Sequence, residues 1–250
     1  DLHSTSKVLG DEPLQLFNKF RDIIVAVDSD RQNGLALLKK IKPSIEVVLL
    51  DDAFQHRSVT AGLNILLTTF DQLYCNDCVL PAGNLREPKS GAKRAHAIVI
   101  TKSPQSLSKD SKSRIINQLN TLPNQEVFFS SIQYANVIIS STSTISIDEL
   151  RGVRFTLVTG IANPTPLITH LKSIGLYFDH LKFKDHHEFS NSERELIYSK
   201  PIVLTTEKDY SRLISETPNK VYYLPIQLEI DRSDAFQKLV ESYVKKTLTN

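Results

Sequence analysis

The sequence predicts an α/β protein with mainly parallel sheets and a cleft between two α/β lobes. Short apolar runs rich in β-branched residues alternate along the chain with amphipathic stretches of helical period. Several of these runs are continuously apolar, which is typical of parallel strands buried on both faces. Such alternation favours helices packed on parallel sheets. The strands outnumber those that one compact sheet usually needs, so we expect two sheets.

The first part of the chain begins this alternation. Gly10-Asp11-Glu12-Pro13 precedes a helical pattern, and Pro13 suits the first turn of a helix. We expect a strand at residues 23–27, a helix at residues 29–40 and a second, buried strand at residues 47–50. The apolar positions of that helix recur with helical spacing on one face.

The rest of the chain continues the same pattern. The run at 137–141 is a candidate edge strand, and the closing helix has Ser233 or Asp234 as its cap. Pro123 ends the predicted helix at residues 106–122. Strands are expected at residues 64–69, 97–101, 127–132, 137–141, 155–159, 202–205 and 221–225, and helices at 106–122, 165–173 and 233–248.

Composition excludes several classes of function. The chain has 250 residues, 40% of them hydrophobic, with 30 basic and 28 acidic side chains. That balance gives no case for nucleic-acid binding, which needs a strongly basic face. The sequence contains no run of 18 apolar residues, so it predicts no membrane-spanning helix. No signal-peptide pattern opens the chain. Because the sequence contains no Met, we expect it to be part of a longer gene product.

Cys75 and Cys78 form a single C-x-x-C pattern. A zinc site would need two further ligands at a suitable spacing, and none follows. A redox motif would open a helix, whereas Cys78 runs into Val79-Leu80-Pro81. We interpret both as ordinary loop residues whose free thiols fit a reducing cytoplasm.

The most informative stretch is Asp51-Asp52-Ala53-Phe54-Gln55-His56-Arg57, directly after the apolar run 47–50. Open α/β sheets bind their ligands at the carboxyl ends of strands. Nucleotide-dependent phosphotransferases hold magnesium with acids at such a strand end. A solvated turn is the alternative interpretation. We favour the site, because this turn gathers carboxylates together with Gln55, His56 and Arg57.

Two further segments combine charge with a constrained backbone. Asp28-Ser29-Asp30-Arg31 follows the first predicted strand and is either a helix cap or part of the site. Residues 80–88 hold two prolines and a glycine and present Arg86 beside Glu87, and an Arg can grip a phosphate with two hydrogen bonds. A basic cluster follows, whose members are individually better explained as a solvated face: Lys89, Lys93 and Arg94.

Three motifs in the second half follow predicted strands. Residues 159–164 make a strand–turn–helix connection in which Gly160 permits close backbone approach. Asp185-His186-His187-Glu188 is either a surface loop or a source of one proton-carrying histidine. Thr205-Thr206-Glu207-Lys208-Asp209 is interpreted mainly as a helix cap with a charged first turn, although its place at a strand's carboxyl end would also allow it to line the cleft.

Taken together and in this order, the motifs resemble those of one family, the tetraacyldisaccharide 4′-kinases, which are lipid A kinases of Gram-negative bacteria. The resemblance covers nearly the whole chain. Its six motifs are G-D-E-P at 10–13, D-D-x-F-Q-H-R at 51–57, L-P-A-G-x-L-R-E-P at 80–88, T-G-I-A-N-P at 159–164, D-H-H at 185–187 and T-T-E-K-D at 205–209.

The resemblance implies a kinase that uses ATP and Mg²⁺ to phosphorylate the 4′-hydroxyl of a tetraacyldisaccharide 1-phosphate, giving lipid IVA in lipid A biosynthesis. It implies two α/β lobes, the first of P-loop NTPase type, joined by a β-ribbon hinge. Residues 1–66 with the C-terminal helix 233–250 would form the P-loop lobe, and residues 67–232 the second lobe. The expected location is the cytoplasmic face of the inner membrane, with no nucleic-acid partner.

The same resemblance assigns roles to residues, motif by motif. Asp11 matches the catalytic aspartate, with one of His186 and His187 as its partner, and Asp51 and Asp52 match the magnesium ligands. The substrate-binding positions are Glu12, Arg31, Gln55, His56, Arg86 and Glu87. The family's P-loop, G-x-x-x-x-G-K-[ST], and a membrane-touching N-terminal helix lie upstream of Gly10 in the family. The P-loop pattern is absent from these 250 residues, so the nucleotide-binding residues stay unknown.

Two other functions remain open at this stage. A non-catalytic homologue could keep only the sugar-phosphate cleft, and a P-loop sequence upstream of Gly10 would favour the kinase over it. A metal-dependent phosphoesterase could use two metal ions held by four side chains. Those four are Asp51, Asp52, His186 and His187.

Overall fold

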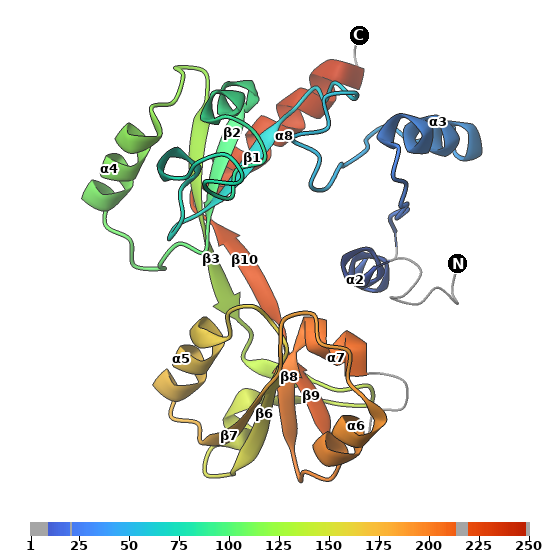
Figure 1. Ribbon diagram of the computed structural model, residues 1–250, viewed down its shortest axis with the longest axis vertical. Coiled ribbons are helices and arrows are strands. Elements are labelled where there is room, and N and C mark those ends of the chain that lie inside the picture. The colour runs from blue at the N-terminus through green and yellow to red at the C-terminus, as the bar shows by residue number, and fades with distance from the viewer. Residues whose placement is uncertain (1–9, 21, 214–219, 249–250) are drawn as a thin grey trace. The chain divides into compact units, whose positions relative to one another are not determined.

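The computed structural model describes residues 10–20, 22–213 and 220–248 of the chain. It divides into two compact units, each with its own sheet (Figure 1). Unit 1 consists of Asp1–Val27 and Tyr134–Gln227, and unit 2 of Asp28–Gln133 and Leu228–Asn250. The expected α/β class with mainly parallel sheets is confirmed.

Unit 2 is built on a four-stranded sheet with the order β1-β2-β3-β10, in which β1, β2 and β3 are parallel. The first four residues of β2 are all buried, so this strand is covered on both faces, as expected for a continuously apolar strand. The strands are β1 (Ile65–Thr69), β2 (Ala97–Thr101), β3 (Glu126–Tyr134) and β10 (Ile226–Ile230).

Helices cover both faces of this sheet (Figure 1). Helix α8 (Ser233–Leu248) packs Phe236 edge-on against Phe128, with the ring centroids 5.1 Å apart. Helix α4 (Lys109–Leu119) covers the other face, where Ile98 and Phe129 are buried. Successive residues of β3 therefore face opposite layers, as the period of a strand dictates.

Unit 1 is built on a six-stranded sheet with the order β5-β4-β9-β8-β6-β7. The four strands β9, β8, β6 and β7 are parallel, and β4 and β5 are antiparallel. The strands are β4 (Val137–Ile139), β5 (Thr144–Ser146), β6 (Phe155–Thr159), β7 (Phe178–Lys182), β8 (Val203–Thr206) and β9 (Val221–Leu224).

The layers of unit 1 follow from the alternation along β6. Phe155 and Leu157 face a core shared with helix α5 (Thr165–Ser173), and Val158 faces the core under the opposite helices (Figure 1). Those helices are α6 (Asn191–Tyr198) and α7 (Glu207–Leu213). The sheet is thus enclosed between helical layers, which leaves the ends of its strands for chemistry.

The remaining elements lie outside these layers. Helix α2 (Asp11–Lys19) belongs to unit 1 and α3 (Arg31–Ile41) to unit 2. Three short 3₁₀ helices complete the described chain: η1 (Tyr74–Asn76), η2 (Lys89–Arg94) and η3 (Ile147–Leu150).

Two predicted strands are wrong. Residues 23–27 and 47–50 form no strand with any described residue. Composition suits a buried strand at both places, yet a strand also needs a neighbour to satisfy its backbone, and Leu49 is 91% exposed. The candidate edge strand at 137–141 is also wrong as an edge, because β4 lies between β5 and β9.

The sequence analysis did not place strands β5 and β10 and helix α6, and it indicated β7 only as a strand-like segment before Asp185. The two-residue alternation of Ile226–Ile230 is a strand signal that could have identified β10. The predicted division into residues 1–66 with 233–250 and residues 67–232 differs from the two units, because β1 pairs with β2 and draws residues 67–133 into unit 2. That division into lobes stays a prediction.

Candidate active site

Three motifs of unit 1 meet at the carboxyl ends of its parallel strands. The turn at Gly160 follows β6, the Asp185-His186-His187 loop follows β7, and Lys208 and Asp209 follow β8. Parallel strands end at one edge of a sheet, which is where open α/β sheets bind their ligands. The backbone N–H of His186 donates to the Gly160 carbonyl at 3.1 Å, which joins two of the motifs directly.

Asp209 lies at the centre of this group and is fully buried. Its Oδ2 accepts hydrogen bonds from the Gly160 N–H at 2.9 Å and from the Thr206 hydroxyl at 2.7 Å. Its Oδ1 pairs with Arg212 Nη1 at 3.2 Å. A Cβ on residue 160 would lie 3.0 Å from that oxygen, so the glycine allows the strand turn to approach the carboxylate.

His186 is exposed and lies between two basic side chains. Arg212 Nη2 is 3.0 Å from its Nδ1, and Lys208 Nζ is 3.3 Å from its Nε2. The residue has a positive φ of 56°, and its N–H donates to the Asp185 carboxylate at 3.0 Å. Asp185 therefore stabilises a backbone turn that few non-glycine residues adopt.

His187 is half-buried and points to different partners. Its Nε2 is 3.0 Å from Glu193 Oε2, and its ring stacks on Phe183 with centroids 4.9 Å apart. The same ring makes a T-shaped contact with Phe189, with centroids 5.2 Å apart. The two neighbouring histidines thus diverge, as adjacent side chains usually do, and only His186 lies beside Lys208 and Arg212.

Helix α2 brings the Gly10-Asp11-Glu12-Pro13 motif to the same part of unit 1. Glu12 pairs with Lys208 at 3.6 Å, and Lys19 pairs with Glu207 at 3.6 Å. Asp11 is the first residue of the helix, but its side chain lies outside the described residues. The backbone therefore places the predicted catalytic aspartate next to a residue that contacts the Lys208 side chain.

Unit 2 holds the two predicted magnesium ligands in a tight turn. Asp51 Oδ1 accepts the N–H of Asp52 at 2.9 Å, and Asp52 has a positive φ of 45°. The Asp52 carboxylate forms an ion pair with Arg86 at 2.7 Å, and both side chains are exposed. Arg86 was expected to grip a phosphate, and here it joins the D-D-x-F-Q-H-R turn to the L-P-A-G-x-L-R-E-P loop.

Glu87 makes a second connection between these two segments. Its carboxylate pairs with Arg94 at 2.7 Å and with Arg57 at 3.1 Å. The hydrogen bond from Arg94 is the main cause that lowers the Glu87 pKa below its ordinary value, and Arg57 adds to it. Arg94 also stacks over the Phe54 ring at 4.7 Å. A Cβ on residue 91 would lie 2.6 Å from the carboxyl carbon, so a larger residue there would displace the Glu87 side chain from its present position.

The other predicted residues of unit 2 lie in turns and at a helix end. Asp30 caps α3 by accepting the N–H groups of Gln32 and Asn33, which confirms the helix-cap interpretation of that motif. Arg31 is the first residue of the helix, and its guanidinium donates to the Asp28 carbonyl. Gln55 is half-buried and His56 exposed in the turn after Asp52.

The basic cluster and the cysteines contribute mainly structure. Lys89 donates to the Cys75 carbonyl at 2.7 Å, and Arg94 holds Glu87 as described. Cys75 and Cys78 are free thiols. Among the described residues, no group of three or more His, Cys, Asp and Glu side chains could hold a metal ion.

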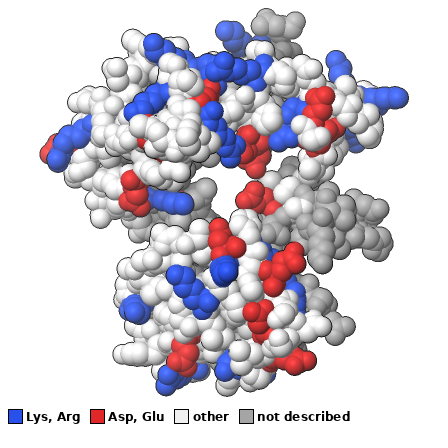
Figure 2. Space-filling model, viewed as in Figure 1, with Lys and Arg blue, Asp and Glu red and all other residues white. Residues whose placement is uncertain are grey.

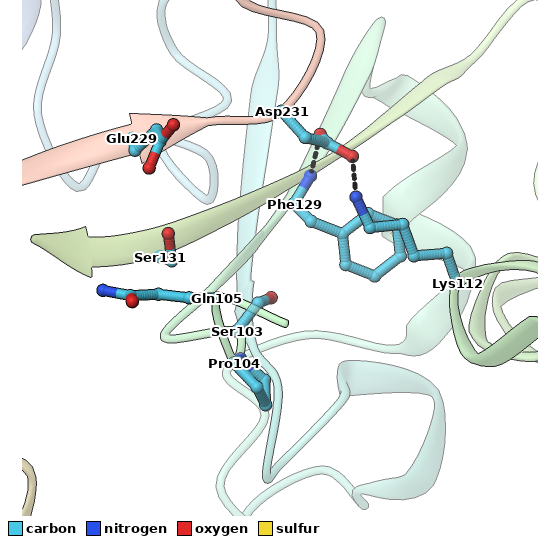
Figure 3. Close-up of a pocket in the computed structure, with 8 residues that line it drawn as sticks. All are labelled: Ser103, Pro104, Gln105, Lys112, Phe129, Ser131, Glu229 and Asp231. Carbon is cyan, nitrogen blue, oxygen red and sulfur yellow. Dashed lines mark hydrogen bonds and ion pairs between the residues drawn. The ribbon is translucent and has the colours of Figure 1, made fainter. Parts of the chain in front are cut away.

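A small cavity of unit 2 contains none of the predicted site residues (Figure 3). Its volume of about 110 Å³ is far below that of a ligand pocket. At its rim, Asp231 accepts the Phe129 N–H at 2.7 Å and pairs with Lys112 at 2.7 Å. The pair ties α4 to the strand end of β10, so we interpret the cavity as part of the scaffold.

Comparison with known proteins identifies the family. The family model described as tetraacyldisaccharide-1-P 4′-kinase (LpxK) matches residues 1–245. The chain belongs to this family. A tetraacyldisaccharide 4′-kinase of Flavobacterium johnsoniae is 42% identical over 255 residues, which cover 99% of this chain and 74% of that protein. One of Bacteroides thetaiotaomicron is 39% identical and covered to 72%.

A crystal structure supports the fold of this LpxK-family chain. The "apo" form of LpxK from Aquifex aeolicus in complex with ATP matches with a TM-score of 0.73 and 26% sequence identity. The match covers 97% of this chain and 71% of that one. The agreement extends over both units of the chain.

The helix-cap interpretation of the T-T-E-K-D motif is confirmed in this LpxK-family protein, because the Thr206 hydroxyl accepts the Asp209 N–H at 3.1 Å. The motif was not counted among the site residues, yet Lys208 and Asp209 also lie in the same group as His186. Arg212 was not singled out at all. The available signal was the spacing of Asp209 and Arg212, two opposite charges one helical turn apart in the helix that follows a strand end.

The expected roles of individual residues remain predictions. Unit 1 carries Asp11, Glu12, His186 and His187, and unit 2 carries Arg31, Asp51, Asp52, Gln55, His56, Arg86 and Glu87.

Glu193, which contacts His187, contributes to the stability of the fold in a way that depends on pH. Hydrogen bonds, first from the Ser190 N–H and then from His187 and the Ser190 hydroxyl, lower its pKa from 4.5 to about 2. Because the folded pKa is lowered, Glu193 stabilises the fold above pH 4.5, and this contribution is lost as the pH falls toward 2. We expect Glu193→Gln to remove this part of the acid sensitivity, as measured by urea unfolding at several pH values.

Gln can still close the capping box with Ser190, so the variant removes the charge and keeps the shape. Glu195→Gln, an exposed change on the same helix, is the control. An unchanged loss of stability between pH 4.5 and 2 in Glu193→Gln would contradict this role.

Proposed function

We propose that this protein phosphorylates the 4′-hydroxyl of a tetraacyldisaccharide 1-phosphate with ATP, giving lipid IVA in lipid A biosynthesis. The observation that carries the proposal is the family match over residues 1–245. Relatives of the same name cover 99% of the chain, and the matching crystal structure is an LpxK in complex with ATP. The protein is accordingly an ATP-dependent phosphotransferase.

We assign Mg²⁺ to Asp51 and Asp52. Mg²⁺ keeps several waters and binds proteins through one or two carboxylates together with substrate phosphates. The turn offers two adjacent carboxylates, which matches that mode. Bound there with ATP, the ion would neutralise charge on the phosphates during transfer. The donor set therefore fits the ion.

The protein groups supply positioning and proton transfer. Asp11 would accept the proton of the sugar hydroxyl as the phosphoryl group is transferred, because a carboxylate next to the hydroxyl can act as its general base. His186 is the better candidate for its partner, since His187 is held by Glu193 and Phe183. Arg86 would bind an anionic group of substrate or nucleotide after exchanging its Asp52 partner.

The face of the protein drawn in Figure 2 has no single large basic area to attract an anionic substrate. On the face shown in Figure 2, Lys and Arg side chains are interspersed with Asp and Glu. Recognition of phosphate on this face therefore depends on local groups such as Arg86 rather than on a broad field.

The substrate class suggests where the protein acts. The acceptor is a lipid, so we propose that the enzyme works at the cytoplasmic face of the inner membrane of a Gram-negative bacterium, with no nucleic-acid partner. No described helix has the length and apolar character that a membrane crossing requires.

The phosphoesterase alternative has less support. It needs both histidines beside Asp51 and Asp52, yet His187 is 3.0 Å from Glu193 and His186 lies against Arg212. The phosphoryl-transfer assay described next distinguishes the kinase from a non-catalytic homologue.

The test uses the protein expressed from its complete gene, with radiolabelled ATP, Mg²⁺ and tetraacyldisaccharide 1-phosphate. We expect label to enter the lipid at its 4′ position only when all components are present. Release of free phosphate from lipid IVA would favour the phosphoesterase instead. Lipid binding without transfer would favour the non-catalytic homologue.

A further inference from the structure

Arg212 is held in a fixed orientation beside the candidate catalytic histidine. Its Nη1 donates to Asp209 Oδ1 and to the Gly160 carbonyl, both at 3.2 Å. Only 7% of the Arg212 side chain is exposed, and Asp209 is fully buried. A planar guanidinium with two such acceptors has little freedom to rotate. The direction of its remaining N–H groups is therefore set by the fold.

One of those groups meets His186. Arg212 Nη2 is 3.0 Å from His186 Nδ1. A guanidinium has donors and no acceptor, so Nδ1 must supply the lone pair. A neutral imidazole carries one proton, which then resides on Nε2. This arrangement reverses the frequent one in which a histidine donates its Nδ1–H to a carboxylate or carbonyl group.

Lys208 competes for the opposite tautomer. Its Nζ is 3.3 Å from His186 Nε2, and an ammonium group is also only a donor. A neutral ring can accept from one of the two cations. Arg212 has the shorter contact and is fixed by Asp209 and Gly160, whereas Lys208 ends a flexible side chain that also pairs with Glu12 at 3.6 Å. Arg212 therefore decides the tautomer.

We propose that Arg212, anchored by Asp209, is a positioning residue that holds His186 as the neutral tautomer with its proton on Nε2. The significance of this for catalysis rests on the proposed kinase function. His186 then offers an N–H donor beside the Lys208 ammonium group. The pair presents two donors to one oxygen, such as a carboxylate or phosphate oxygen, and His186 does not act as a base through Nδ1.

The tautomer can be measured directly. Protein labelled with ¹⁵N-histidine gives a two-bond ¹H–¹⁵N spectrum in which the ring nitrogens that carry a proton and those that do not are distinct. The spectrum is recorded about two pH units above the ordinary imidazole pKa, where free rings are neutral. A His186→Asn variant identifies the signals of His186. We expect a protonated Nε2 and an unprotonated Nδ1 in the wild-type protein.

Arg212→Lys is the decisive variant, because a single ammonium group cannot hold Asp209, Gly160 and His186 in the same fork. We expect its His186 signals to move toward a mixture of tautomers or to the Nδ1–H form, while the His187 signals stay in place. The matched control is Arg154→Lys, at an exposed pair with Asp179 on the same unit. Asp209→Asn tests the anchor and should give the same shift as Arg212→Lys if it folds.

The kinase assay adds a second readout. Loss of one charged hydrogen bond at the histidine should lower kcat of Arg212→Lys roughly tenfold to a hundredfold and leave KM for ATP almost unchanged. An Nδ1–H tautomer in the wild-type protein, or a His186 spectrum that Arg212→Lys leaves unchanged, would overturn the proposal. Absence of kinase activity in the wild-type protein would refute the proposed function, and the spectrum would still decide the tautomer.

Discussion

Replacing Asp51 or Asp52 with alanine is expected to lower turnover at least about a hundredfold, as loss of a magnesium ligand should. The two carboxylates lie in one turn, where Asp51 orients the backbone of Asp52. Phosphoryl transfer depends on positioning and on neutralisation of charge, so an ion that loses one of two protein ligands no longer holds the phosphates in place. The measurement is kcat as a function of Mg²⁺ concentration.

The Asp52–Arg86 ion pair means that Asp52→Ala changes two interactions at once. Asp52→Ala removes a proposed metal ligand and also the ion-pair partner of Arg86, whereas Asp51→Ala removes only a proposed ligand. Arg86→Ala and the double variant complete a cycle that separates the two effects. The pair is exposed on both sides, so its contribution to stability is small and the variants should fold.

Asp71→Ala is the matched control, since it removes an exposed carboxylate from a turn of the same unit. Activity close to that of the wild-type protein in both Asp51→Ala and Asp52→Ala, at saturating Mg²⁺, would rule out the magnesium role.

The sequence predicted the fold best for strands that lie between two other strands of the same sheet. Ala97–Thr101 and Phe155–Thr159 were placed from apolar runs alone, and both are central and buried on two faces. The same reasoning was wrong at 47–50, because apolar composition reports the preference of a segment for burial and says nothing of which strand lies beside it. Ile226–Ile230 was missed since its exposed, alternating residues lack a continuous apolar signal.

The candidate site was predictable in its motifs but not in its contacts. The D-H-H motif indicated one working histidine, and the structure separates His186 from His187 by their partners. The sequence shows only the spacing of Arg212 three residues after Asp209, which is common on any helix. The burial of that carboxylate and the contact with the Gly160 carbonyl, 52 residues earlier, are properties of the fold and leave no local pattern.

Asp11→Asn is expected to lower kcat roughly a hundredfold to ten-thousandfold, the range over which a positioned general base contributes. Asn has the shape of Asp and can still occupy the first turn of α2, so the helix should form. An amide cannot accept the hydroxyl proton, so the loss should appear in kcat while KM for ATP stays almost unchanged.

Side-chain contacts within unit 1 support this expectation. Glu12, the next residue, pairs with Lys208 at 3.6 Å, and Lys208 Nζ lies 3.3 Å from His186 Nε2. The start of α2 is therefore joined to the candidate histidine through two side chains. Asp22→Asn, an exposed change of the same chemistry after the helix, should leave kcat intact. If Asp11→Asn kept the wild-type kcat, the proton would have to leave by another group, and the kinase would need a different base.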